Sequence, residues 1–82
     1  MNDDAMLAAR QLLAEALELE IAAVPMDAAI GRLDAWDSLA HLRLVQALEK
    51  RLGRELPAET SVGIERLHDI AALLAAAPTV TA

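Results

Sequence analysis

Apolar side chains near the start of the chain recur every three to four residues, which is the spacing of one face of an α-helix. The members of this face are Ala5, Ala9, Leu12, Leu13 and Ala16. Polar residues take the opposite face: Asp4, Arg10, Gln11, Glu15 and Glu18. The pattern predicts a first helix from about residue 3 to residue 19.

A long connection without helical periodicity follows. It extends to about Trp36, and Pro25, Asp27 and Gly31 interrupt any helical pattern within it. Helix connections in bundles usually have about 2 to 8 residues, so a longer connection either carries function or packs back on the fold. We favour packing, for which the available apolar side chains are Val24, Met26, Ile30 and Leu33.

Asp37 and Ser38 mark the start of a second helix, and Gly53 marks its end. Asp and Ser side chains accept hydrogen bonds from the free N–H groups of a helix N-terminus, whereas Gly adopts the left-handed conformation that closes a helix. Projected around this helix, one set of side chains is predicted to be buried: Leu42, Leu44, Val45, Leu48 and Leu52, with His41 among them. The opposite side carries polar residues and one apolar residue that is out of place: Arg43, Gln46, Lys50, Arg54 and Leu39.

The remaining pattern predicts a short helix and a final helix. Pro57 breaks the chain, and Thr60 and Ser61 can cap a helical piece at about residues 61–64. A last helix is expected from about Glu65 to Ala76, with an inner face made of Ile64, Leu67, Ile70, Ala71 and Leu74. We therefore predict one all-α domain over residues 1–77, followed by a frayed tail at residues 78–82. Its fold is a four-helix bundle with a long loop between the first two helices and a short third helix.

The composition agrees with a small helical domain and excludes several classes of protein. Ala and Leu, both strong helix formers, supply 34 of the 46 apolar residues. Without cysteine the chain has no disulfide, thiolate metal site or cysteine nucleophile. The net charge of −6 argues against nucleic acid as a partner. No apolar run reaches the roughly 20 residues of a membrane span, and the start of the chain is acidic, unlike a secretion signal. We expect a monomeric, cytoplasmic protein.

Candidate catalytic chemistry is sparse. The three glycines are scattered and form no phosphate-binding loop, and two histidines alone cannot fill a structural zinc site. Ser38, His41 and an aspartate can be written as a triad, but no glycine-rich elbow or oxyanion framework accompanies them. We therefore predict that the chain is not an enzyme and holds no metal of its own.

The tripeptide Asp37-Ser38-Leu39 is the remaining candidate site. An Asp–Ser pair is a common helix cap, and capping alone explains its presence. A serine at a helix N-terminus is also accessible to solvent, and a phosphodiester attached there gains from the helix dipole and the free N–H groups. This combination indicates a serine presented for modification rather than one activated for catalysis.

The run from Leu33 through Trp36 to Asp37-Ser38-Leu39 resembles the acyl carrier proteins, together with the residues that follow it: Leu42, Leu44, Val45, Leu48, Glu49 and Leu52-Gly53. The resemblance implies that Ser38 receives 4′-phosphopantetheine from coenzyme A, through a phosphopantetheinyl transferase that uses Mg²⁺. It also implies that Asp37 assists the metal of the transferase and that Leu39 contacts partner enzymes. The thiol at the end of the arm would hold acyl or aminoacyl groups as thioesters, which a loading ligase supplies and a downstream synthase or transferase uses.

The run Trp36-Asp37-Ser38-Leu39 followed by His41 resembles the stand-alone carriers of specialised pathways, and two departures argue against a carrier of fatty-acid synthesis. The usual glycine two residues before the aspartate is Ala35 here. Carriers of fatty-acid synthesis present an acidic second helix, whereas residues 40–54 hold four basic residues against one acid (Arg43, Lys50, Arg51 and Arg54 against Glu49), a local charge of +3. The rest of the chain carries −9. We expect Leu39, Arg43 and Lys50 to contact partners, in a polyketide, polysaccharide-modifying or hydroxy-acid system.

Three further side chains have predicted roles, and one alternative function stays open. Trp36 is expected to hold the start of the second helix against the core rather than to stack on cargo. His41 is expected to be packed and hydrogen-bonded, and His68 to face outward. The alternative to a carrier is a small, non-enzymatic helical protein-interaction module that is never modified at Ser38.

Overall fold

The computed structural model describes residues 2–76, and it describes side chains from residue 4 on. Four α-helices and one short 3₁₀ helix lie in this part of the chain: α1 (Asn2–Leu17), η1 (Ile21–Ala23), α2 (Ser38–Leu52), α3 (Ala58–Gly63) and α4 (Leu67–Ala76). No β-strand occurs among residues 2–76, so the predicted all-α class is confirmed. The tail predicted for residues 78–82 lies outside the described residues.

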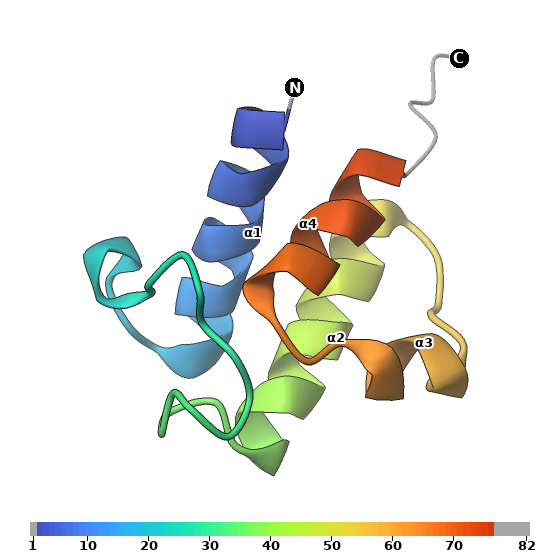
Figure 1. The fold of residues 1–82 in the computed structure, drawn as a ribbon. Helices are drawn as coiled ribbons and strands as arrows, with labels where there is room; N and C mark the ends of the chain where they lie inside the picture. Colours follow the sequence, from blue (N-terminus) through green and yellow to red (C-terminus); the bar gives the residue numbers. More distant parts are fainter. Residues whose placement is uncertain (1, 77–82) are drawn as a thin grey trace.

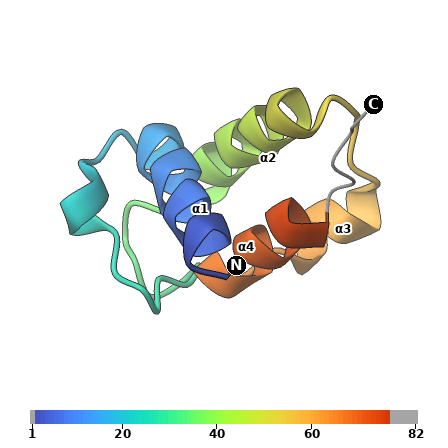
Figure 2. The same ribbon diagram turned by 90° about the horizontal axis from the view of Figure 1, so that it is seen from above.

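Helix α1 packs against both α2 and α4 (Figure 1). The first turn of α1 and the last turn of α4 lie at one end of the molecule, and the start of α2 lies at the opposite end. Seen from above, α3 stands at one side of the molecule (Figure 2), and along the chain it connects α2 to α4. None of the helices of residues 2–76 combines the length and the apolar character needed to cross a membrane.

The core is built from the small and branched aliphatic side chains that the helices turn inward, together with one tryptophan. The largest fully buried side chains are Trp36, Leu13, Leu44, Leu48, Leu67, Ile70 and Val24. The buried faces predicted for α1 and α4 are mostly confirmed, although Ala5 and Leu74 are only half-buried. Several alanines of the helices are also buried in this core, including Ala9, Ala40 and Ala71.

Helix α1 ends two residues earlier than predicted, in a left-handed turn at Glu18 (φ 60°). The Glu18 N–H donates to the Glu15 carbonyl (3.2 Å), and the Leu19 N–H donates to the Ala14 carbonyl (2.8 Å). These two bonds form a Schellman cap, which usually has Gly at the position that Glu18 occupies here. Because a residue other than glycine does not indicate such a turn in the sequence, the helix was predicted to extend two residues too far.

Backbone hydrogen bonds attach the long loop between α1 and α2 to the segment before α4, in addition to the burial of Val24, Ala28 and Trp36 in the core. Its residues 28–30 pair with residues 65–67: the Ile30 N–H donates to the Glu65 carbonyl (2.9 Å), and the Leu67 N–H donates to the Ala28 carbonyl (3.0 Å). Ala29 and Arg66 form an antiparallel bridge between these two bonds.

A side chain of α1 adds a second attachment of the same loop, which differs from the expected apolar one. The half-buried Arg10 donates from Nε to the Val24 carbonyl and from Nη2 to the Ile21 carbonyl, both at 3.1 Å. Val24 is buried and Leu33 is half-buried, as predicted. The predicted packing of Met26 and Ile30 is wrong, because both side chains are exposed.

The bounds of α2 are confirmed, but among its predicted core residues Leu52 is only half-buried and Leu42 is exposed. Leu42 is 54% exposed. The buried face of α2 is centred on Ala40, Leu44 and Leu48, and Leu42 follows Ala40 by two residues, a rotation of about 200° around the helix. Leu42 therefore lies on the outer face with Leu39.

The bounds of the last two helices are shifted relative to the prediction. Helix α3 begins directly after Pro57 rather than near residue 61, because proline is well suited to a helix start. Helix α4 begins at Leu67 rather than Glu65. The Asp69 Oδ2 atom accepts from the backbone N–H groups of Glu65 and Arg66 (2.9 and 3.0 Å). These bonds hold Glu65 and Arg66 before the helix, so α4 begins two residues after the predicted start.

Candidate functional site

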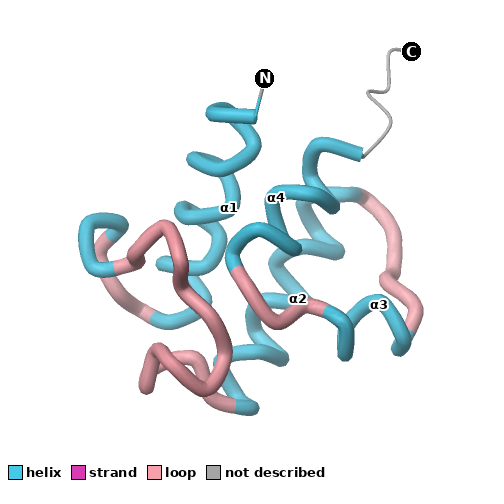
Figure 3. The backbone as a smooth tube through the Cα atoms, viewed as in Figure 1, coloured by secondary structure: helices cyan, strands magenta, loops and turns pink. Residues whose placement is uncertain are grey.

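Ser38 is the first residue of α2 and is exposed. It lies where the long loop meets the helix, at the end of the molecule opposite the first turn of α1 (Figure 3). The backbone before it is extended, since Asp37 has φ −102° and ψ −172°. The serine side chain therefore stands at the edge of the fold, within reach of another molecule.

Asp37 fixes the start of α2. Its Oδ1 atom accepts from the Ala40 N–H at 2.9 Å, and its carbonyl accepts from the His41 N–H at 2.8 Å. An N-cap of this kind satisfies one of the free donors of the first turn. The N–H groups of Ser38 and Leu39 precede the first intrahelical hydrogen bond, so they leave a partial positive charge beside the serine hydroxyl.

Trp36 anchors the loop immediately before this cap. Its side chain is 2% exposed, and its indole ring lies near the His41 ring, with centroids 6.1 Å apart and an angle of 19° between the planes. The Trp36 Nε1–H group donates to His41 Nδ1 at 3.1 Å. The predictions that Trp36 holds the helix start against the core and that His41 is packed and hydrogen-bonded are both confirmed.

His41 joins α2 to α3 through its second ring nitrogen. An indole N–H can only donate, so His41 Nδ1 is the acceptor and the neutral ring carries its hydrogen on Nε2. This nitrogen lies 2.9 Å from the Ser61 carbonyl oxygen, to which it donates. Trp36, His41 and Ser61 thus form one relay of hydrogen bonds, which we call the histidine relay.

The histidine relay matters because α3 has little other attachment. No residue of α3 is buried, and the buried anchors Leu56 and Ile64 lie just outside it. On the side nearer α2, Glu49 Oε2 accepts from the Leu56 N–H at 2.9 Å. The sequence indicated a hydrogen-bonded His41 but gave no sign of Ser61 as its partner, since the two residues are twenty positions apart.

The same relay bears on the Ser38–His41 pair considered from the sequence. Both ring nitrogens of His41 are directed at groups other than Ser38, so the structure does not join the two side chains by a hydrogen bond. Among the described residues, no cluster of three or more His, Asp or Glu side chains could hold a metal ion.

The residues predicted to contact partners lie on the outer face of α2. Leu39 is 57% exposed, and Lys50, about three turns further along the same face, is also exposed. Arg43 is also on this face, but its Nη1 atom lies 3.3 Å from Glu18 Oε2, so its charge is offset by α1. Leu42, an exposed side chain not predicted for this surface, joins it, and Val62 of α3 is a further exposed apolar residue (77%).

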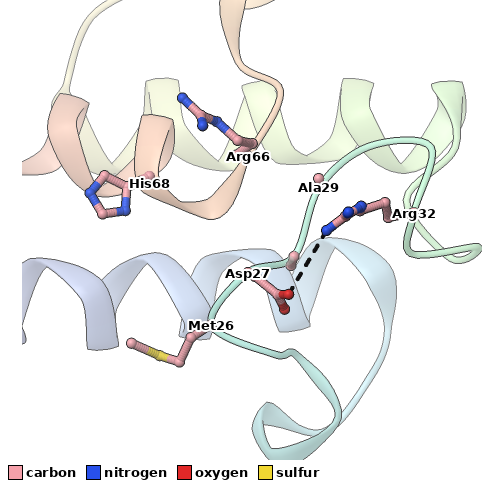
Figure 4. A pocket seen from close by; sticks show the side chains of 7 residues that line it. Met26, Asp27, Ala29, Arg32, Arg66 and His68 are labelled. Atoms are coloured by element: carbon pink, nitrogen blue, oxygen red, sulfur yellow. Dashed lines mark ion pairs between the residues drawn. The ribbon is translucent and has the colours of Figure 1, made fainter.

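A cavity of about 470 Å³ lies elsewhere, between the long loop and the start of α4 (Figure 4). Met26, Asp27 and Arg32 line it from the loop, and Arg66 and His68 line it from the α4 side. His68 is exposed, as predicted. The Arg32 and Arg66 side chains are 76% and 67% exposed, so water screens their charges and an anion would gain little there. None of the residues 36–39 contributes to this cavity.

Comparison with known proteins found no match, either among protein-family models or among curated sequences.

Proposed function

We propose that the chain is an acyl carrier protein of a specialised biosynthetic pathway, modified at Ser38 by 4′-phosphopantetheine. The observation that carries this proposal is the setting of Ser38: an exposed hydroxyl on the first residue of α2, placed by the Asp37 cap and the buried Trp36. When attached, the arm supplies a terminal thiol that holds acyl or aminoacyl groups.

The residues around Ser38 suit a phosphodiester. The backbone N–H groups of Ser38 and Leu39 and the helix dipole favour negative charge at this position. α2 has no acidic residue in its first turn, so no carboxylate within the helix opposes the phosphate there. The Asp37 side chain is occupied in part by the Ala40 N–H, and its Oδ2 atom is left for the Mg²⁺ of a transferase.

The attachment is a phosphoryl transfer that the partner transferase performs. The Ser38 hydroxyl oxygen forms a bond to the phosphorus next to the pantetheine of coenzyme A. The bond from this phosphorus to the bridging oxygen of the pyrophosphate breaks, and 3′,5′-adenosine bisphosphate leaves with the electron pair. The hydroxyl proton passes to the transferase. Ser38 needs no base within its own chain, which accords with a His41 ring engaged by Trp36 and Ser61.

The charge of α2 supports the classes of pathway and partner that we propose. Helix α2 holds Arg43, Lys50 and Arg51 and a single acid, Glu49, so partners that carry basic docking patches should bind it poorly. A loading ligase and a downstream synthase or transferase of a specialised system are the partner classes that we propose, with a monomeric carrier acting in the cytoplasm.

Intact-mass measurement tests the proposal. The protein is incubated with coenzyme A, Mg²⁺ and a broad-specificity phosphopantetheinyl transferase, and a known carrier serves as the positive control. The chain contains two serines, Ser38 and Ser61, which provide a matched pair of variants. We expect the wild type and Ser61→Ala to gain one phosphopantetheine, and Ser38→Ala to gain none.

The other outcomes separate the proposal from its alternative. A wild-type chain that stays unmodified while the control carrier is converted would leave the helical protein-interaction module as the better description. A gain that persists in Ser38→Ala would place the attachment at another residue.

A further inference from the structure

We propose that His41 is a positioning residue for the modification of Ser38 and that it acts through Trp36. This inference rests on the proposed function, because it concerns how the serine hydroxyl is presented to the transferase. Trp36 precedes Ser38 by two residues, and His41 follows it by three. The hydrogen bond between the Trp36 and His41 side chains therefore closes a ring around the turn that carries the serine. We call this bond the serine clamp.

The two rings of the serine clamp meet edge to edge. Trp36 Nε1 lies 3.1 Å from His41 Nδ1, whereas the ring centroids are 6.1 Å apart and the ring planes are 19° from parallel. The lone pair of Nδ1 lies in the plane of the imidazole ring, so this arrangement directs it at the indole N–H. Because Trp36 is only 2% exposed, loss of the clamp leaves the indole N–H without a partner inside the core.

The clamp attaches the serine turn to two other parts of the fold. On one side, the Trp36 side chain lies in the core, and the Trp36 backbone N–H donates to the Leu33 carbonyl at 2.8 Å. On the other side, His41 Nε2 donates to the Ser61 carbonyl of α3 at 2.9 Å. The turn between Trp36 and His41 is thus tied both to the long loop and to α3.

The Asp37 cap cannot replace the clamp. Its Oδ1 atom accepts from the Ala40 N–H, and its carbonyl accepts from the His41 N–H. Both bonds join residues of the same turn, so they fix the shape of the turn without tying it to the loop or to α3. The clamp adds the tie to the buried Trp36 and thereby limits the positions that the Ser38 hydroxyl can take.

A positioning role has a definite kinetic consequence. If the turn is ready for transfer in only a fraction of the molecules, the apparent affinity for the transferase falls by that fraction, while the chemical step within the complex is unchanged. Loss of the clamp therefore raises KM. A residue that acts as the base lowers kcat instead, and both ring nitrogens of His41 are engaged by groups other than Ser38.

Modification kinetics of matched variants test the role of the clamp. His41→Leu removes the clamp and the bond to Ser61, whereas Trp36→Phe keeps an apolar ring and removes only the clamp. Arg10→Met is the control for lost stability, because it breaks two hydrogen bonds that hold η1 and the residue after it rather than the serine turn. Each variant is incubated with coenzyme A, Mg²⁺ and a broad-specificity phosphopantetheinyl transferase, and intact mass is measured at varied carrier concentration. Circular dichroism checks that each variant is folded at the assay temperature.

The two clamp variants should differ from the control in KM. We expect His41→Leu and Trp36→Phe to raise KM about five- to tenfold, with kcat within about twofold of the wild type. His41→Gln, which keeps an acceptor and a donor, should bring KM back to within about threefold of the wild type. Arg10→Met should leave KM within about twofold, because distant changes act independently.

Amide hydrogen exchange tests the clamp without any transferase. The Ala40 N–H is bonded to the Asp37 cap, so its exchange rate reports the opening of the serine turn. We expect this rate to be about fivefold higher in His41→Leu and Trp36→Phe than in Arg10→Met. The comparison with Arg10→Met removes the part of the change that follows from lower global stability.

The results separate the two proposals. If the wild type is modified but His41→Leu and Trp36→Phe keep the KM of Arg10→Met, the positioning role is overturned and the carrier function stands. A lower kcat at unchanged KM would also overturn it, because His41 would then act in the chemical step. Equal exchange of the Ala40 amide in all variants would overturn the clamp itself. A wild type that stays unmodified while a known carrier is converted would remove the carrier function, and the positioning role with it.

Discussion

Replacement of His41 by leucine should destabilise the domain through the histidine relay. Leucine removes both ring nitrogens and keeps an apolar side chain of moderate size. The Trp36 N–H, on a side chain that is 2% exposed, loses its acceptor at 3.1 Å, and the Ser61 carbonyl loses its donor at 2.9 Å. The perturbation therefore tests whether one side chain holds the loop, α2 and α3 together.

The magnitude follows from the burial of the two groups. A buried donor left without a partner costs about 1–3 kcal/mol. The Ser61 carbonyl costs less, because Ser61 is only half-buried and water can reach it. We expect the free energy of unfolding to fall by about 2 kcal/mol. For a domain of this size each kcal/mol corresponds to roughly 4–8 °C in Tm, so Tm should fall by about 8–16 °C.

Trp36 itself supplies the assay, since it is the only tryptophan of the chain. Its fluorescence is followed through urea unfolding for the wild type, His41→Leu and His68→Leu. His68 is exposed, so its variant should remain within about 0.5 kcal/mol of the wild type. His41→Gln, which keeps an acceptor and a donor, should recover part of the loss. If His41→Leu is as stable as His68→Leu, the relay does not hold the site and the reasoning is refuted.

Three further changes should act on other parts of the fold and site. Glu18→Gly should raise the free energy of unfolding, measured by urea titration, by up to about 1 kcal/mol, because glycine relieves the strain of the left-handed turn. The exposed ion pair with Arg43 that the variant loses contributes little. A free energy of unfolding below that of the wild type would contradict the role of backbone strain. Arg10→Met should lower the free energy of unfolding by about 2 kcal/mol, because the two charge-assisted hydrogen bonds to the carbonyls of Ile21 and Val24 are lost. Amide hydrogen exchange at residues 21–24 should become faster. Asp37→Ala should lower the free energy of unfolding by about 1 kcal/mol, because the N-cap of α2 is lost. Asp37→Asn should keep the stability of the wild type but slow the modification of Ser38. An Asn variant modified at the wild-type rate would exclude a role of the carboxylate in the transfer.

Local chemistry made α2 the most predictable element. Asp37 and Gly53 carry their own signals, a capping carboxylate and a residue that adopts positive φ freely, and both ends of the helix were predicted correctly. The end of α1 was not predicted correctly, because the Schellman turn at Glu18 depends on backbone hydrogen bonds that the identity of a glutamate does not indicate. Leu42 was misplaced because the rotation of a helix about its own axis is set by the neighbours it packs against.

The candidate site was predictable in its centre and not in its surroundings. The exposed Ser38 and the packed Trp36 and His41 followed from position and residue type. The partner of His41 in α3 and the exposure of Val62 could not be read from the sequence, since both depend on how α3 is placed by contacts distant along the chain.

The bridge between Ala29 and Arg66 has a consequence for the order in which the molecule assembles. Everything from residue 30 to residue 65, Ser38 included, lies in the segment that this bridge closes. Closing so long a segment is entropically unfavourable until the helices on either side already pack. Helices α1, α2 and α4 can form from neighbouring residues, whereas the bridge between Ala29 and Arg66 must form late. The bond between the exposed residues Ile30 and Glu65 is also expected to open at a lower free energy than the core, so thermal motion of the folded state should be concentrated in the long loop.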